Sequence, residues 1–147
     1  MPLKDRIQQD MKDSMRGGNK SRLAVIRLIL AAIQQKEVDE RIELDDTQIT
    51  AVLDKMTKQR RESISQFEKA GRNDLVDQET AELQIIQEFL PEQLGEAEIN
   101  ALIEAAMAQT GASSIKDMGK VMGQLKPKLQ GRADMGAVSA LIKARLG

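Results

Sequence analysis

The chain has 147 residues, of which 41% are hydrophobic, 31% charged and only 1% aromatic. A chain of this length buries one modest core or two small ones, and a core without aromatic bulk favours helices over a β-sandwich. Cysteine and histidine are both absent. Disulfides, cysteine zinc sites and Ser-His-Asp catalysis are therefore excluded, together with the commonest general base and metal ligand.

The net charge of -1 conceals an uneven distribution along the chain. Residues 1–71 carry +2, residues 72–110 carry -8 and residues 111–147 carry +5. The acidic stretch lacks the loop spacing of a calcium site and is interpreted as a solvated helix face. The basic stretch at the carboxyl end is the part expected to attract a polyanion.

The amino-terminal half shows the spacing of two amphipathic helices. The first is predicted from four apolar residues at four-residue intervals, Leu3, Ile7, Met11 and Met15, and ends at Gly17-Gly18. The second follows at once and fades through the charged stretch 36–43. Its predicted buried stripe is Leu23, Ile26, Leu30 and Ile33, widened by Val25 and Ile29.

A third helix is predicted to begin at a cap, Asp45 or Asp46, and to continue toward Gly71. Heptad spacing fails within it because Arg60 and Ser63 fall on positions that should be apolar, so an ordinary helical bundle is expected. A fourth helix starts at Asn73 or Asp74 and runs to Leu90. Pro91 lacks the backbone donor that would continue it, and the domain boundary is placed there.

Shorter helices are predicted beyond the boundary, at 96–109, 114–125 and 134–146, with Gly111, Pro127 and Gly131 between them. Ser113 or Ser114 and Asp134 are the expected caps of the last two. The predicted fold is all-α, with a bundle or hairpin of long helices in an amino-terminal domain (1–91) and a small three-helix bundle in a carboxyl-terminal domain (92–147).

The segment from Gly119 to Gly123 contains a Gly-Lys pair, but it lacks the glycine and the Ser or Thr that a phosphate-binding loop requires at its ends. Two interpretations remain for the glycines. They remove side chains from one helix face either for packing within the fold or for close approach of an external partner. Ser113, Ser114 and Lys116 suggest Ser-Lys catalysis only if the lysine is buried, and a helix cap explains the serines more simply. No catalytic or metal-binding residue and no cofactor is assigned.

Basic side chains cluster around the last two predicted helices. Lys126, Lys128 and Arg132 are expected in a turn around Pro127 and Gly131. Lys116 and Lys120 are expected one helical turn apart. Such cations could converge on a phosphate backbone, and the shortage of aromatic residues argues for contact with backbone or folded shape over stacking on single-stranded bases.

Four segments, taken in order, resemble the GatB/YqeY family and specifically its stand-alone YqeY-like members. These segments are Arg22 to Ile33, Glu88 to Leu94, Met118 to Gly123 and Gly131 to Asp134. The resemblance implies a two-part helical fold similar to the tail of the B subunit of glutamine-dependent tRNA amidotransferase, a region associated with holding tRNA. It carries Gly119, Lys120, Gly123 and Arg132 over as a tRNA surface, to which Lys116, Lys126 and Lys128 are added on electrostatic grounds.

The expected function is that of a non-catalytic adaptor that binds tRNA or a tRNA-handling enzyme. Two alternatives stay open, which are a protein-interaction module that binds no RNA and an amidotransferase component with activity of its own. A carbon-nitrogen ligase label with glutamine as donor would be inherited from the full enzyme, whose catalytic domains do not fit in this chain. The amino terminus has charge where a secretory signal needs an apolar run, and no membrane-spanning stretch is predicted, so the expected location is the cytoplasm.

Overall fold

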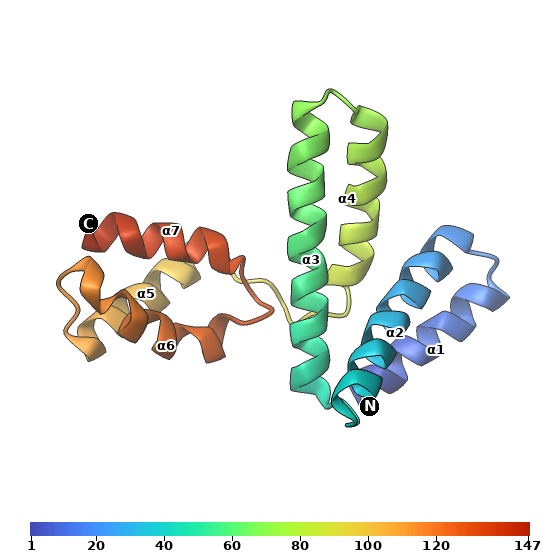
Figure 1. Ribbon diagram of the computed structural model, residues 1–147, viewed down its shortest axis with the longest axis horizontal. Helices are drawn as coiled ribbons and strands as arrows, with labels where there is room; N and C mark the ends of the chain where they lie inside the picture. The colour runs from blue at the N-terminus through green and yellow to red at the C-terminus, as the bar shows by residue number, and fades with distance from the viewer. The chain divides into compact units, whose positions relative to one another are not determined.

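A computed structural model describes all 147 residues as seven α-helices and one short 3-10 turn, without strands (Figure 1). The all-α prediction is confirmed. The chain divides into two compact units, Met1–Pro91 and Glu92–Gly147, each with its own hydrophobic core. None of the helices combines the length and the apolar character needed to cross a bilayer.

The first unit consists of two helical hairpins, which pair α1 (Leu3–Arg16) with α2 (Lys20–Glu40) and α3 (Asp46–Lys69) with α4 (Asn73–Gln87) (Figure 1). Gly18, at φ 68°, makes the tight turn between α1 and α2. Asp45 caps α3 by accepting from the backbone N–H of Gln48, whose side chain accepts from Asp45 in return. Asp46 has a different role, because its carboxylate accepts from the backbone N–H of Leu3 at 2.9 Å.

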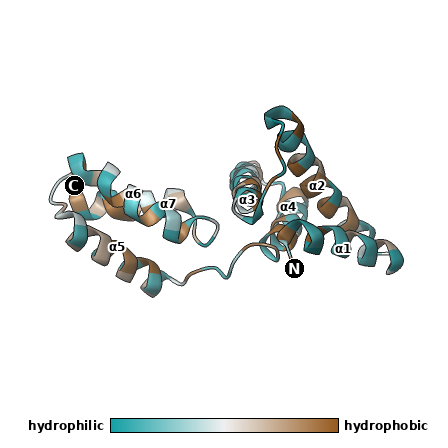
Figure 2. Ribbon diagram, turned by 90° about the horizontal axis from the view of Figure 1, so that it is seen from below, coloured by the Kyte–Doolittle hydropathy of each residue, from teal (hydrophilic) through white to brown (hydrophobic).

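The core of the first unit is aliphatic apart from Phe89, and hydrophobic residues recur along the inner sides of its helices (Figure 2). In α2 the stripe lies slightly to one side of the predicted one, because Leu23 and Leu30 are only half-buried. The fully buried positions are Val25, Ile26, Ile29 and Ile33. This shift follows from packing, since α2 contacts α1, α3 and α4 at once and turns the middle of its apolar surface between them.

The heptad break in α3 is an ion-paired position. Arg60 Nε lies 3.3 Å from a carboxylate oxygen of Glu79 and 3.1 Å from one of Glu82, both on α4. The three side chains are only about a fifth exposed. The positive charge of Arg60, where α3 packs against α4, is therefore balanced by two nearby carboxylates. This packing agrees with the expectation of an ordinary helical bundle in place of a coiled coil.

The second unit is formed by α5 (Glu96–Thr110), the 3-10 turn η1 (Ile115–Asp117), α6 (Met118–Leu129) and α7 (Met135–Leu146). Gly95 stands at the start of α5 without a side-chain cap, whereas Asp134 caps α7 by accepting from Gly136 N–H at 3.1 Å. The predicted break at Pro127 is wrong, because α6 continues through it to Leu129. Burial of Leu125 and Leu129 on one face holds this last turn in helical form despite the missing hydrogen bond.

Replacing Arg60 with Met should lower the free energy of unfolding by about 1–2 kcal/mol, because Glu79 and Glu82 then face each other without a counter-charge. Adding Glu79→Leu and Glu82→Leu should recover most of this stability, since the whole seam then becomes apolar. Urea unfolding followed by circular dichroism measures both effects. A single variant as stable as the parent would show that the ion pairs contribute nothing.

Candidate nucleic-acid interface

Helix α6 has two opposite faces of different chemistry. Val121, Leu125 and Leu129 recur at four-residue intervals and are buried in the core of the second unit. Gly119, Gly123 and Pro127 recur with the same spacing on the opposite side and are exposed. These three residues are named the bare face of α6.

The glycines of the bare face are not needed for packing within the chain. A Cβ atom added to Gly119 or Gly123 would meet no heavy atom within 4 Å. The interpretation that they let a neighbouring helix of this chain approach therefore finds no support in the structure, and close approach of an external partner stays a prediction. The open backbone of α6 is the geometric centre of the candidate interface.

Three exposed lysines accompany the bare face. By helical geometry Lys120 and Lys128 project on one side of it and Lys126 on the other. Lys126 and Lys128 lie in the last turn of α6, which corrects their predicted place in a loop, and their charge also complements the negative helix end. Lys120 Nζ lies 3.9 Å from Asp117, a weak pair at an exposed site.

The start of α6 is fixed by Asp117. Its carboxylate accepts from the backbone N–H groups of Ser113 at 3.0 Å and Ser114 at 3.3 Å, and these bonds hold the pKa of Asp117 below its ordinary value. Ser114 occupies the capping position of the turn, as predicted. Lys116 is exposed in this turn, so the burial that Ser-Lys catalysis requires is missing.

Arg132 differs from the lysines because its backbone and its side chain both bond the segment that enters the second unit. Its backbone carbonyl accepts from Leu94 N–H at 2.8 Å, and its Nε donates to the carbonyl of Glu92 at 3.4 Å. Beside it, the amide of Gln93 donates to the carbonyl of Gly131 at 2.7 Å. Arg132 thus anchors the segment that enters the second unit, a role that the sequence did not reveal.

Charge is divided among the helices of the second unit. Helix α5 carries Glu96, Glu98 and Glu104 and no basic residue, whereas the basic side chains lie on η1, α6, the following turn and α7. Arg145 of α7 lies 3.5 Å from Glu104. Five of the seven basic side chains of the second unit lie on α6 or at its two ends, and the other two, Lys143 and Arg145, lie on α7.

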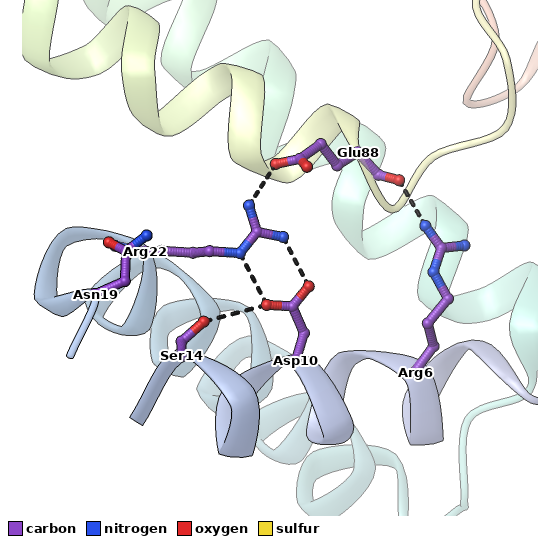
Figure 3. Close-up of polar contacts among 6 residues, drawn as sticks. All are labelled: Arg6, Asp10, Ser14, Asn19, Arg22 and Glu88. Carbon is purple, nitrogen blue, oxygen red and sulfur yellow. Dashed lines mark hydrogen bonds and ion pairs between the residues drawn. The ribbon is translucent and has the colours of Figure 1, made fainter. Parts of the chain in front are cut away.

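The first unit contains a polar cluster that sequence reasoning did not identify (Figure 3). Arg22 donates two hydrogen bonds to the carboxylate of Asp10, at 2.8 and 2.7 Å, and a third to Glu88 at 2.7 Å. Ser14 donates to Asp10 at 3.2 Å. The hydrogen bond from Arg22, with its charge, keeps the pKa of Asp10 below its ordinary value, and the same bond raises the pKa of Arg22.

This cluster joins α1 and α2 to the end of α4. Arg6 donates to the backbone carbonyl of Glu88 at 2.6 Å, and the guanidinium groups of Arg6 and Arg22 lie 5.4 and 6.0 Å from the centre of the Phe89 ring. Arg22 and Glu88 each begin a segment that resembles the GatB/YqeY family. Their pairing spans 66 residues, so no local spacing could have predicted it.

A family model described as "Yqey-like protein" matches residues 4–146. The chain belongs to this YqeY-like family. The resemblance found in the sequence is confirmed at this level, and the chain is a YqeY-domain protein.

Curated relatives of the YqeY-like chain bear the name "Altered inheritance of mitochondria protein 41, mitochondrial". The relative from Pyrenophora tritici-repentis is 33% identical, over 97% of this chain and 80% of its own length. The relative from Lachancea thermotolerans is 30% identical, over 95% and 76%. The relative from Eremothecium gossypii is 40% identical over a shorter stretch, 57% of this chain and 46% of its own length.

The names of these relatives contradict the predicted cytoplasmic location, because the relatives are mitochondrial proteins. The prediction was made by default from a charged amino terminus and the lack of a spanning stretch. Neither property separates one aqueous compartment from another, since a helical bundle needs the same polar surface in both. The cytoplasmic expectation is therefore withdrawn.

The first unit should become less stable in acid partly through Asp10. Because its pKa is lowered on folding, its contribution is complete above the ordinary aspartate value of about 3.9 and is lost as the pH falls through the lowered pKa. Asp10→Asn should reduce stability at neutral pH and flatten the acid dependence. Urea unfolding midpoints from neutral to strongly acidic pH measure both effects. Asp13→Asn is the control, because Asp13 is exposed on the same helix and its carboxylate accepts only from the nearby Gln9 side chain. Identical profiles for the two variants would contradict the assignment.

Two glycine variants should shift stability in opposite directions. Gly123→Ala should stabilise the second unit by about 0.5–1 kcal/mol, because glycine is unfavourable inside a helix and the added methyl meets open space. Gly131→Ala should destabilise it by at least about 1 kcal/mol, because Gly131 is buried at φ 75°. Thermal unfolding compares them. A decrease in the stability of Gly123→Ala would mean that the bare face is covered.

Proposed function

We propose that this YqeY-like protein is a non-catalytic adaptor that binds tRNA through the bare face of α6. The observation that carries the proposal is the open space at Gly119 and Gly123, in a helix whose exposed side is flanked by lysines. A phosphate backbone could approach the helix closely there while lysines on both sides neutralise phosphate charge.

The chemistry of the second unit favours contact with RNA backbone and shape over reading of bases. The two aromatic residues of the chain, Phe67 and Phe89, both belong to the first unit. Stacking platforms for unpaired bases are therefore missing beside α6, whereas lysines and exposed helix backbone are available. A folded RNA such as tRNA offers closely spaced phosphates with defined geometry, which fits this surface.

The resemblance to the amidotransferase tail supports tRNA as the ligand class. It does not support a reaction performed by this chain, because Ser113 and Ser114 belong to a capped turn and Lys116 is exposed. Ligase activity is accordingly left out of the proposal. A tRNA-handling enzyme remains the kind of protein that such an adaptor would serve.

The proposal is tested by titrating the full chain with tRNA across a salt series. Replacing Lys120, Lys126 and Lys128 with Ala should weaken binding at low salt and reduce the slope of log affinity against log salt by roughly 0.7–0.9 for each phosphate that is no longer neutralised. Lys143→Ala, on α7, measures the effect of losing one lysine charge away from α6, and the effect of each replacement is compared per charge removed. Arg132 is left unchanged because its side chain also bonds the backbone carbonyl of Glu92, so its substitution would change more than surface charge.

A second pair of variants separates the bare face from general electrostatics. Gly119→Gln and Gly123→Gln add neutral bulk in open space, favour helix formation and leave the charge unchanged. We expect stability to rise and tRNA affinity to fall. If tRNA fails to bind at low salt, or if both the lysine and glutamine variants bind as the parent does, the proposed function is wrong.

A further inference from the structure

Methionine is the principal oxidisable side chain of this protein. The sequence has eight methionines and no cysteine, histidine, tryptophan or tyrosine. A peroxide that meets the chain therefore finds its main target in the methionine thioethers. Half of them lie in the second unit and are distributed over all three of its α-helices. These four, Met107, Met118, Met122 and Met135, are named the edge methionines.

Each edge methionine is partly buried and packs against the core of the second unit. Together they make up four of the nine partly buried hydrophobic residues around that core. Met118 begins α6, Met135 begins α7 and Met107 lies in the last turn of α5. Part of each side chain therefore reaches solvent, while the rest covers the core near the ends of the helices that form it.

Oxidation of a thioether by a peroxide such as hydrogen peroxide needs no other reactant. A sulfur lone pair attacks one peroxide oxygen, so that an S–O bond forms and the O–O bond breaks. The transferred oxygen gives its proton to the departing hydroxide, which leaves as water, and two electrons pass from sulfur to the peroxide. Methionine sulfoxide reductases reverse the change, one enzyme for each epimer, by releasing the oxygen as water with two electrons from a pair of thiols.

A sulfoxide is poorly suited to the rim of this core. Its oxygen is a polar acceptor, which either stays in the core without a donor or turns outward and uncovers apolar surface. The core of the second unit has only nine fully or nearly fully buried residues, two of them alanines, against twelve in the first unit. The second unit therefore loses a larger share of its apolar contacts when its methionines are oxidised.

The other four methionines are placed where an added oxygen disturbs less. Met1 is 85% exposed and Met15 52% exposed, and neither packs against a core. Met11 and Met56 do pack against the core of the first unit, but each lines a groove, of about 550 and 500 Å³, that opens to solvent. A sulfoxide oxygen at these two positions can be hydrated without leaving the groove.

We infer that the edge methionines are a modification site, at which a peroxide reversibly loosens the second unit while the first unit stays folded. Met122 connects this site to the bare face, because by helical geometry it lies between the buried side of α6 and Lys126. Loosening of α6 should release tRNA, and this consequence alone rests on the proposed function. The loosening itself follows from the packing of the second unit.

The test treats the full chain with hydrogen peroxide and returns one portion to the reduced state with both sulfoxide reductases. Peptide mass spectrometry identifies each oxidised methionine, and hydrogen–deuterium exchange measures each helix separately. Oxidation of the edge methionines should speed amide exchange in α5, α6 and α7 by about tenfold or more, whereas exchange in the first unit should change by less than about twofold. Treatment with the reductases should restore the original exchange.

Leucine variants assign the effect to particular sulfur atoms. Replacing all four edge methionines with Leu conserves their volume and should remove the sensitivity of the second unit to peroxide. Met11→Leu combined with Met56→Leu is the matched control and should leave that sensitivity intact. If circular dichroism shows that the fourfold variant is unfolded, Met118→Leu with Met122→Leu replaces it, and α6 should then exchange more slowly after oxidation than it does in the oxidised parent.

Any of four results would overturn the inference: edge methionines that resist peroxide while Met1 and Met15 are oxidised, unchanged exchange after their oxidation, equal loosening of both units, or leucine variants as sensitive as the parent. Titration with tRNA before and after oxidation is a separate measurement. A reduced chain that fails to bind tRNA contradicts the proposed function alone, whereas unchanged exchange after oxidation contradicts this inference alone.

Discussion

The bond set of Arg22 is the constraint on which the first unit depends. Contacts between aliphatic side chains constrain the relative orientation of two helices only weakly. The planar guanidinium of Arg22 constrains it more strongly, because it makes two hydrogen bonds to Asp10 and one to Glu88. Phe89 lies beneath this group and fills the adjoining part of the core. The same bonds fix the end of α4, so the chain leaves the first unit at a defined place. Removing one partner would leave a charged group partly buried and unpaired, which is costlier than removing an equivalent exposed pair.

With the helix ends fixed in this way, the exposed side of α6 remains unused by the fold. The bare face of α6 offers backbone and separate lysines, which suits a regular array of phosphates.

Local chemistry explains what the sequence predicted well. Asp134 accepts a bond from the first turn of its helix, and apolar spacing marks each helix of the first unit. The fourth helix was predicted to run to Leu90 but ends at Gln87, four residues before Pro91. Contacts between distant residues could not be predicted in this way. Arg60 occupies a position where the heptad pattern requires an apolar residue, because it pairs with Glu79 and Glu82 on another helix. Similarly, nothing near Arg132 in the sequence indicates that it bonds Glu92 and Leu94. Pro127 was predicted to interrupt α6, but the helix continues through it, because burial of its apolar face outweighs one missing hydrogen bond.

The glycines of α6 show how an energetic argument can point beyond the fold. Each of them weakens the helix by up to about 1 kcal/mol relative to alanine, and neither provides room for another part of the chain in return. A small unit with an aliphatic core has little stability to spare. Folding alone would therefore favour alanine at both positions, whereas Gly131 is explained by its backbone angle. A departure from helix propensity without internal compensation is typical of a functional surface. What distinguishes Gly119 and Gly123 is the access they leave to the backbone, which is the property that a closely bound partner would use.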